Sequence, residues 1–380
     1  MSLFRTRDFG DIPVAQGCTD VSELEIESVT SMQKSGRRAV VLGGTGVLGR
    51  AAARRLLDAG WTVDLVGRDA SHVPSDLMIK GARFLAVDRQ NSAALGRLIG
   101  GGADLLVDAL CYTSADARQL LPFLSDVTSV VMLSSKAVYA DAEGRHVNSE
   151  EPPQFPSPIR EDQSTLKPSS TSDYNSREGY GACKVAAEMT LLGSGAPVTV
   201  IRASKVHGDG ATMPGEWVFV KRIIDQRPAI FLAHRGLGVN HTTAAANTAA
   251  LIERVAAVPG ARILNSADPD APNGLEIARA IAALCEYEWQ EFLLDDDDAS
   301  GLGRHPWDAR PPIILDTRAS LQLGYVPVGT YAETVGGAVG YLVNAHRTGA
   351  VPADFGTLFS TYLDYAAEDA YLASRAVPSA

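Results

Sequence analysis

Basic residues are in the minority in this chain, which narrows the range of its partners. The sequence has 34 lysines and arginines against 45 aspartates and glutamates, so the formal net charge is −11. Nucleic acids and anionic membranes carry negative charge themselves, and an acidic protein surface does not attract them. We therefore expect neither nucleic acid nor a membrane as the main partner.

Cysteine is also scarce, and its positions show no grouping. The four cysteines are widely separated along the chain: Cys18, Cys111, Cys183 and Cys285. This distribution is typical of reduced thiols in a cytosolic protein. His207 and His241 likewise lack partners at metal-ligand spacing, so no metal is expected.

Long apolar runs are absent from the sequence. No stretch approaches the ~20 residues that a membrane-spanning helix needs. The first residues lack the basic, apolar and cleavable pattern of a secretory signal, which favours a cytoplasmic location. A chain of 380 residues with 46% hydrophobic content can form two lobes or one large α/β domain with additions.

An alternation of expected strands and helices begins at Arg38. Strands are expected over residues 38–42, 61–66, 83–87, 104–109, 127–133 and 198–202. Helices are expected over residues 50–59, 91–99, 114–124 and 180–193. Valine- and leucine-rich strands that alternate with helices predict a parallel sheet covered on both faces. The predicted fold class is α/β, a Rossmann-type doubly wound parallel sheet.

Three glycines at intervals of three, Gly43, Gly46 and Gly49, follow the first expected strand and lead into a helix. Glycine lets a strand turn sharply, so that backbone amides and the helix N-terminus face a pyrophosphate. Much later, Tyr180 and Lys184 place a phenol and an ammonium on one face of a helix. A dinucleotide cradle combined with this pair indicates hydride chemistry.

The regular alternation weakens after residue 208, which predicts a smaller C-terminal substrate-binding lobe. The expected organisation is a polar N-terminal arm over 1–36, an NAD(P)-binding Rossmann domain with the catalytic residues over 37–208, a mainly substrate-binding lobe over 209–345 and a C-terminal helical tail over 346–380. The polar segment over 140–178 has no hydrophobic period, and long loops in α/β folds are more often functional than idle.

Over about residues 38–345, the chain resembles the extended short-chain dehydrogenase/reductases, also called the NAD-dependent epimerase/dehydratase family. The residues that carry this resemblance are the spaced glycines, Asp88, Ser134-Ser135-Lys136-Ala137-Val138-Tyr139, Tyr180-x-x-x-Lys184 with Glu188, Asp316, and Leu323-Gly324-Tyr325-x-Pro327. The combination is much more specific than any single motif.

The resemblance implies a catalytic group of three side chains. Tyr180 is the implied acid/base at the reacting hydroxyl or carbonyl. A phenol has a reference pKa of about 10, so we expect Lys184 and the charge of the nicotinamide to favour the phenolate. Lys184 would also hold the nicotinamide ribose, and Ser135 would bond the same substrate oxygen as Tyr180.

The resemblance also implies an NAD(P) cofactor. Its implied contacts in the glycine turn are Gly43, Thr45, Gly46, Val47, Leu48 and Gly49. Asp88 would receive the adenine amino group. After the second strand, where NAD-selective enzymes present a carboxylate to the ribose, this chain has Arg68. A guanidinium can grip a 2′-phosphate, so Arg68, together with Arg50, favours NADP; the adjacent Asp69 makes this preference modest.

Two departures from the family pattern bear on the reaction and its substrate. Lys136 and Ala137 stand where sugar-nucleotide 4,6-dehydratases carry an acidic pair. Lys136 is a candidate for a catalytic role in place of that pair if burial lowers its pKa. The alternative is that Lys136 is a surface lysine. Lys205 stands where the family commonly has an asparagine near the nucleotide. This change weakens the case for a standard nucleoside-diphosphate sugar, although Lys205 could still meet a phosphate.

Polar and aromatic residues of the C-terminal lobe, and of the segment directly before it, are candidates for substrate contact. The candidates in this part of the chain are Lys205, His207, Trp217 and Lys221, with Arg222, His234, Arg235 and His241 nearby. An aromatic plane and several donors suit a polyhydroxylated or heterocyclic ligand. A structural role is the alternative for each residue taken singly.

The leading hypothesis is an NAD(P)-dependent epimerase/dehydratase of specialised metabolism that transiently oxidises a sugar-like or nucleoside hydroxyl to a ketone. The ketone acidifies neighbouring C–H bonds and permits epimerisation or loss of water. The alternative is an NADPH-dependent ketone reductase or alcohol dehydrogenase, which Arg68 favours. A nucleotide-sensing protein without turnover is disfavoured by the intact Ser135, Tyr180 and Lys184. Relatives often form dimers, which leaves a homodimer open.

Overall fold

The computed structural model describes residues 36–295 and 301–376. Almost all of the expected N-terminal arm over 1–36, and Cys18 within it, lie outside the described residues. The described segments belong to one compact unit. Within them, none of the helices has the length and apolar character required to cross a membrane.

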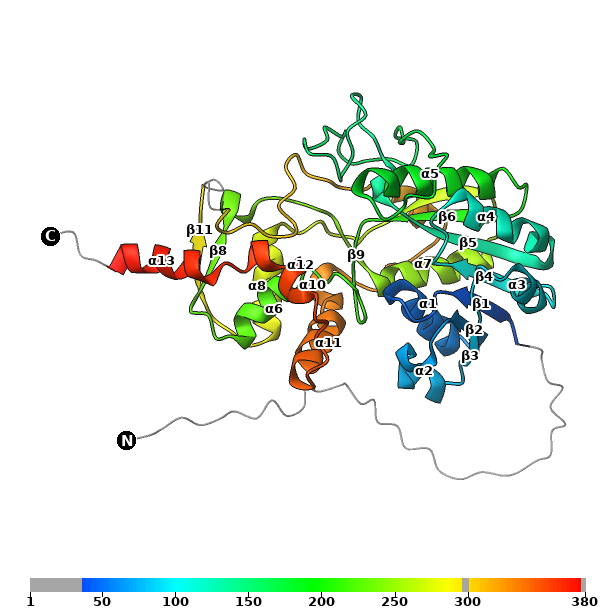
Figure 1. The fold of residues 1–380 in the computed structure, drawn as a ribbon, viewed down its shortest axis with the longest axis horizontal. Coiled ribbons are helices and arrows are strands. Elements are labelled where there is room, and N and C mark those ends of the chain that lie inside the picture. Colours follow the sequence, from blue (N-terminus) through cyan, green and yellow to red (C-terminus); the bar gives the residue numbers. More distant parts are fainter. Residues whose placement is uncertain (1–35, 296–300, 377–380) are drawn as a thin grey trace, which may run out of the picture. The chain divides into compact units, whose positions relative to one another are not determined.

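A seven-stranded parallel sheet forms the centre of this unit (Figure 1). Its strands are β1 (Arg38–Leu42), β2 (Thr62–Gly67), β3 (Arg83–Ala86), β4 (Ala103–Asp108), β5 (Val127–Ser135), β6 (Val198–Ala203) and β10 (Arg262–Ser266). Their order is β10-β6-β5-β4-β1-β2-β3, and the direction of winding reverses between β1 and β4. The predicted Rossmann-type doubly wound fold is confirmed. In such sheets, ligands bind outside the carboxyl ends of the strands at this reversal.

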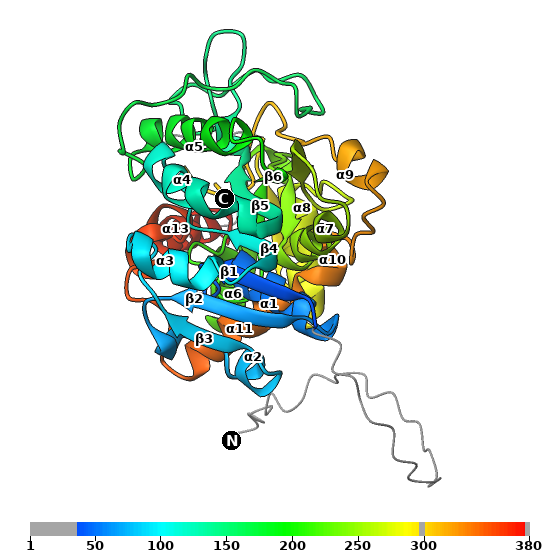
Figure 2. The same cartoon turned by 90° about the vertical axis from the view of Figure 1, so that its right-hand side faces the viewer.

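Helices cover both faces of the sheet, as Figure 2 shows. On one face lie α1 (Val47–Asp58), α2 (Ser75–Ile79) and α7 (Ala245–Ala257); on the other lie α3 (Ser92–Ile99), α4 (Ser114–Leu120) and α5 (Arg177–Leu192). Leu56 of α1 and Leu251 of α7 are fully buried in the same cluster as Val41 of the sheet. Apolar side chains on both faces account for the near-continuous valine and leucine content of the strands.

The sheet and its helical cover also include α7 and β10, which lie in the range that the sequence pattern had assigned mainly to the substrate-binding lobe. α7 packs beside α1, and β10 pairs with β6 at the edge of the sheet. The strand β10 reads Arg-Ile-Leu-Asn-Ser, with only two apolar residues. An apolar run this short does not predict a strand by itself. The segment is a strand because it pairs with β6.

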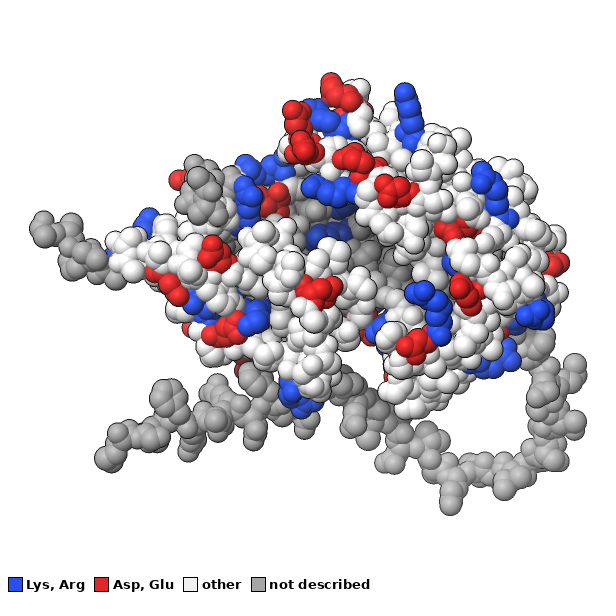
Figure 3. Space-filling view, viewed as in Figure 1, with Lys and Arg blue, Asp and Glu red and all other residues white. Residues whose placement is uncertain are grey.

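The remaining elements lie outside the central sheet, most of them to one side of it (Figure 1), and several of them share a second hydrophobic cluster that includes Trp217, Ile277 and Phe355. They are β7 (Lys205–His207), α6 (Trp217–Ile224), β8 (Ala229–Leu232), β9 (Thr242–Ala244), α8 (Gly274–Leu284), β11 (Gln290–Leu293), α9 (Arg318–Gln322), α10 (Tyr331–Thr334), α11 (Gly336–Arg347), α12 (Phe355–Leu358) and α13 (Tyr365–Ala376). β7 pairs with β9, and β8 pairs with β11, each in a small parallel sheet. On the face that Figure 3 shows, acidic and basic side chains are interspersed, and the surface is hollowed near its middle.

A long connection joins β5 to α5. After a short 3₁₀ turn over Lys136–Val138, the chain has neither helix nor strand until α5 begins at Arg177. Backbone hydrogen bonds from Ala140 N to Ser164 O and from Leu166 N to Val138 O fold this connection back on itself. Ser164 and Leu166, in the middle of the connection, are thereby held close to the point where β5 stops.

Candidate active site

A cavity of about 900 Å³ lies at the carboxyl ends of the central strands. The turn after β1 and the ends of β2, β4, β5 and β6 all contribute to its lining, as do α5 and the long connection. The cavity is therefore at the position that the sheet topology predicts. Its volume is in the range that small-molecule and cofactor sites occupy.

The structure gathers all of the predicted cofactor contacts around this cavity. The lining includes Gly43, Thr45, Gly46, Val47, Leu48, Gly49, Arg68, Asp88 and Lys184. Arg68 is exposed at the end of β2. Arg50 does not line the cavity; its guanidinium donates to the Thr45 carbonyl at 2.6 and 3.1 Å and so braces the turn. These positions make the expected contacts possible and leave their roles as predictions.

The glycine turn brings the start of α1 close to the backbone of the turn itself. Gly43 has φ +81°, in the left-handed region that favours glycine. A Cβ on Gly49 would lie 2.2 Å from the Gly43 carbonyl oxygen and 2.9 Å from Gly44 Cα. Gly46 caps α1 without a side-chain hydrogen bond. The first amides of α1 are thus open to an anion, and the turn fits a dinucleotide pyrophosphate.

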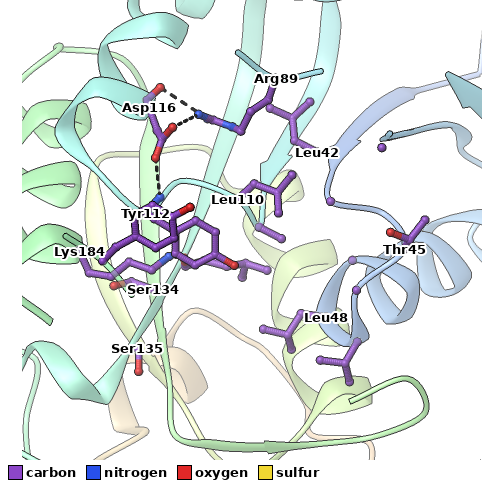
Figure 4. A pocket seen from close by; sticks show the side chains of 18 of the residues that line it. Leu42, Thr45, Leu48, Arg89, Leu110, Tyr112, Asp116, Ser134, Ser135 and Lys184 are labelled. Atoms are coloured by element: carbon purple, nitrogen blue, oxygen red, sulfur yellow. Dashed lines mark hydrogen bonds and ion pairs between the residues drawn. The ribbon is translucent and has the colours of Figure 1, made fainter. Parts of the chain in front are cut away.

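The three predicted catalytic residues line the same cavity. Ser135 is the last residue of β5, while Tyr180 and Lys184 lie on consecutive turns of α5. The helix begins there because the Ser176 side chain accepts a hydrogen bond from Gly179 N at 2.9 Å. Figure 4 shows Ser135 and Lys184 from two different elements at one cavity.

Lys184 is 3% exposed, and its ammonium has specific partners. The Nζ atom donates to the carbonyl oxygens of Cys111 and Leu133, each at 2.9 Å. It also stands 4.5 Å from the centroid of the Tyr112 ring. Two of the three N–H donors are therefore engaged by the backbone at the ends of β4 and β5.

The electrostatics of Tyr180 differ from the expectation. Burial raises the pKa of the Tyr180 phenol above its ordinary value, and a hydrogen bond with Ser135 opposes that rise. For Tyr112, burial also raises the pKa, and there the ammonium of Lys184 is the main opposing influence. The charge of Lys184 thus acts on Tyr112, because its ammonium lies over that ring and is turned toward two carbonyls.

Several lining residues were missed by sequence reasoning. They are Arg89, Gln90, Tyr112, Asp116, Ser172, Tyr174, Ser204 and Thr212. None stands in a motif with a distinctive spacing, and their gathering depends on the topology. An arginine directly after Asp88 was the one available hint, because a charged residue there lies at the carboxyl edge of the sheet.

Arg89 forms the centre of a buried charge network in the wall of the cavity (Figure 4). Its guanidinium contacts Asp108 at 2.5 Å and Asp116 at 2.7 Å. Burial acts to raise the pKa of Asp116, but Arg89 and hydrogen bonds with Gln90 and Thr113 outweigh it and lower that pKa. An ionised Asp116 accepts hydrogen bonds from the backbone amides that follow β4, so the network holds this part of the lining in place.

Lys136 is buried, at 7% exposed, and is not the surface lysine of the alternative interpretation. Its Nζ donates to Ser204 Oγ at 3.0 Å and to Asn240 Oδ1. Burial, and then the charge of Lys205, lowers the pKa of Lys136 well below its ordinary value. Lys136 does not line the cavity but contacts Ser204, which does. Its catalytic role stays a prediction.

The four candidate substrate contacts lie outside the cavity lining, because each has another partner. Trp217 packs in the second hydrophobic cluster, 5.6 Å from Phe355 between ring centroids. His207 Nε2 is 3.0 Å from Asp268 Oδ2, and Lys221 pairs with Asp225. The Nζ atom of Lys205 stands 5.6 Å from the centroid of the Trp307 ring. The geometry thus gives these residues structural contacts.

The neighbouring candidate residues also have polar partners within the protein. Arg222 pairs with Glu368, His234 with Asp308, and Arg235 with Asp295, while His241 Nε2 contacts the carbonyls of Asp268 and Asp270. In the described part of the chain, no group of three or more His, Cys, Asp or Glu side chains is arranged to hold a metal ion.

Fold and site together define a Rossmann-type α/β protein with a glycine turn, a serine, a tyrosine and a lysine at one cavity. Residues 39–227 match the model of the NAD dependent epimerase/dehydratase family. The chain belongs to this family, and the prediction of an enzyme of the extended short-chain dehydrogenase/reductase type is confirmed. No curated protein sequence matches the chain significantly.

Solved structures of similar fold include three enzymes. The UDP-glucose-4-epimerase of Stenotrophomonas maltophila, with bound NAD and formylated UDP-arabinopyranose, has 17% identity and a TM-score of 0.63, covering 82% of this chain and 99% of its own. The Bordetella bronchiseptica enzyme WbmH, with NAD+, has 18% identity and a TM-score of 0.60, covering 83% and 99%. The dTDP-glucose 4,6-dehydratase of Bacillus anthracis, with NAD, has 14% identity and a TM-score of 0.60, covering 82% and 98%. At these identities the likeness shows the fold.

Substitution of Gly49 tests the close approach at the turn. In Gly49→Ala the new Cβ would meet backbone atoms of Gly43 and Gly44, so we expect a destabilisation of about 1–3 kcal/mol and weaker dinucleotide binding. Gly337→Ala, in α11, meets nothing within 4 Å and should be neutral or stabilising. Denaturant unfolding and titration with NADH measure both effects. Equal behaviour of the two variants would contradict the packing argument.

Substitution of Ser135 tests the electrostatics of Tyr180. Because the Ser135 hydrogen bond lowers the pKa of Tyr180, Ser135→Ala should move deprotonation of this phenol to higher pH. The measurement is the ultraviolet absorbance of tyrosinate against pH, with the signal of Tyr180 isolated by subtracting the same titration of a Tyr180→Phe background. Ser172→Ala, at another serine of the cavity, is the control. A midpoint that stays or falls in Ser135→Ala would refute the assignment.

Proposed function

We propose that this protein is an NAD(P)-dependent epimerase or dehydratase that acts on a secondary hydroxyl of a sugar-like or nucleoside substrate. The observation that carries the proposal is the convergence of the glycine turn, Ser135, Tyr180 and Lys184 on one cavity. When bound, a nicotinamide cofactor supplies a reversible oxidation of the hydroxyl to a ketone. Family membership supports this class of reaction.

The cofactor end of the cavity would be formed by the turn after β1 and by the ends of β2 and β3. The open amides at the start of α1 bind the pyrophosphate, and Asp88 receives the adenine. Lys184, with one N–H donor not engaged by the backbone, holds the nicotinamide ribose. Structures of similar fold contain NAD, while Arg68 at the ribose position favours NADP here.

The reacting end would be formed by Tyr180 and Ser135. Tyr180 takes the proton of the substrate hydroxyl, and Ser135 donates a hydrogen bond to the same oxygen. The raised pKa of Tyr180 means that the phenol holds its proton at neutral pH in the protein alone, so the positive charge of an oxidised nicotinamide is needed to favour the phenolate. Once the ketone exists, its neighbouring C–H bond is acidic, and inversion or loss of water can follow.

The polarity of the remaining lining supports a polyhydroxylated substrate. Hydroxyl groups come from Ser172 and Tyr174 of the long connection, from Ser204 after β6, and from Thr212. Such groups both donate and accept hydrogen bonds, which suits a sugar or a nucleoside. Solved structures of similar fold contain UDP-glucose or a UDP-pentose. A cytoplasmic location and a homodimer stay predictions.

The second candidate is an NADPH-dependent ketone reductase or alcohol dehydrogenase, which Arg68 favours. The two functions differ in the fate of the hydride. Mass analysis of the cofactor that the purified protein retains, with its redox state, distinguishes them. Incubation with UDP-glucose, free sugars and nucleosides in deuterium oxide should give an epimerised or dehydrated product without net change in NAD(P)H, with deuterium at a substrate carbon where a C–H bond beside the ketone is broken. Stoichiometric cofactor consumption would instead establish the reductase.

Substitution of Tyr180 tests the proposed chemistry. Tyr180→Phe should lower turnover by about a hundredfold or more, the loss expected for a positioned acid/base, and leave the dissociation constant for the cofactor nearly unchanged. Tyr341→Phe, at a partly exposed tyrosine of α11, is the matched control. Steady-state kinetics and cofactor titration give both quantities. Full turnover in Tyr180→Phe would exclude Tyr180 as the acid/base.

Substitution of Arg68 tests cofactor preference. Arg68→Asp should shift the ratio of the NADP and NAD dissociation constants toward NAD by about tenfold to a hundredfold, the effect of losing a charge-assisted hydrogen bond. Arg118→Asp, at an exposed arginine of α4 that does not line the cavity, carries the same charge change as a control. An unchanged ratio in Arg68→Asp would show that Arg68 does not face the 2′ position.

A further inference from the structure

An aromatic stack joins two segments that are far apart in the sequence. Tyr112 follows β4, and Tyr174 lies near the end of the long connection between β5 and α5. Their ring centroids are 4.9 Å apart with an interplanar angle of 14°. Both residues line the cavity. The long connection is therefore in direct contact with the loop after β4 at the mouth of the site.

The ring of Tyr112 also contacts the buried ammonium of Lys184 (Figure 4). The described part of the chain places no carboxylate within ion-pair distance of Lys184, and its polar partners are the carbonyls of Cys111 and Leu133. A desolvated ammonium needs compensation, and the face of an aromatic ring provides it. The Tyr112 ring is thus part of the environment that determines where the ammonium stands.

The backbone beneath the Tyr112 ring is fixed independently of Lys184. The amides of Tyr112 and Thr113 donate to Asp116 Oδ2 at 3.1 and 2.9 Å. Asp116 is held in turn by Arg89. Because this support is buried and charged, it keeps the ring in place, and the ring can determine the position of Lys184.

We propose that Tyr112 is a positioning residue for Lys184, and that Tyr174 reinforces it by stacking, so that docking of the segment 167–176 and placement of the ammonium are coupled. The set Tyr174, Tyr112 and Lys184 is called the tyrosine–lysine stack below. The proposal rests on the proposed function only in taking Lys184 as the cation that serves the cofactor and Tyr180. The stack itself is a property of the protein without ligands.

Three variants distinguish the contribution of the Tyr112 ring from that of its hydroxyl and from that of the stacked residue Tyr174 in the long connection. Tyr112→Phe keeps the ring and removes only the hydroxyl. Tyr112→Leu removes the ring, and Tyr174→Leu removes the stacking partner at a half-buried loop position. Each is purified as the full chain. The Tyr174→Leu variant decides the coupling by itself if Tyr112→Leu does not fold.

The first measurement is the rate at which an amine-specific reagent modifies Lys184, followed by peptide mass spectrometry. Lys136, which is buried and outside the stack, is the internal control for general loosening of the fold. We expect faster modification of Lys184 in Tyr112→Leu and Tyr174→Leu, an unchanged rate in Tyr112→Phe, and an unchanged rate at Lys136 throughout. Hydrogen exchange of residues 167–176 should accelerate in the same two variants.

The second measurement is the dissociation constant for NADH. We expect Tyr112→Leu to bind about threefold to thirtyfold more weakly, the range of a cation–π contact as it becomes desolvated. Tyr174→Leu should show a smaller loss, and Tyr112→Phe should bind as the unmodified chain does. Absence of NADH binding by the unmodified chain would refute the proposed function, while the Lys184 and exchange measurements would still decide the stack.

Several results would overturn the proposal. Equal damage in Tyr112→Phe and Tyr112→Leu would show that the hydroxyl, not the ring face, is what matters. An unchanged rate at Lys184 in Tyr112→Leu would separate the ring from the ammonium. Faster exchange of residues 167–176 in Tyr174→Leu with no change at Lys184 would break the coupling. Parallel acceleration at Lys136 would reduce the role of Tyr112 to general stability.

Discussion

The close approach of α1 to the turn after β1 is the constraint on which the site depends. Gly49 lies against the Gly43 carbonyl with no room for a Cβ, so the helix starts directly at the edge of the sheet. Its first amides and the positive end of its dipole face the cavity. The parallel strands end at the same edge, and the side chains that follow them meet there because the topology leaves them no other place.

Two buried cations of the cavity lining, Arg89 and Lys184, have different kinds of partner. Arg89 is neutralised by two carboxylates, and the resulting network serves as part of the wall. Within residues 36–295 and 301–376, the contacts of the Lys184 ammonium are two carbonyl oxygens and an aromatic ring. Carboxylates that pair with a cation cancel most of the electrostatic potential it exerts on its surroundings. A cation that contacts only neutral groups is not cancelled in this way, so its positive charge can act on a bound ligand. This difference supports the proposal that Lys184, and not Arg89, serves the cofactor and Tyr180.

The elements beyond the sheet contribute less to the cavity than their polar residues suggested. Trp217, Lys221 and His207 all have partners within their own part of the chain. The long connection and the residues after β6 line the cavity instead. A loop without secondary structure can approach a bound molecule closely because its backbone is not committed to a ladder or a helix.

The sequence by itself determined six of the seven strands of the sheet, the glycine turn, and the pairing of Tyr180 with Lys184, because these depend on local periodicity, on backbone freedom at glycine, and on spacing within one helix; Ser135 was added to them by the family resemblance. The sequence did not predict β10, whose short run acquires its conformation only by pairing with β6. Tertiary structure alone decided that Lys136 is buried and that Tyr112 and Tyr174 meet over Lys184. Contacts between residues far apart along the chain leave no periodic pattern, so no local reading of the sequence contains them.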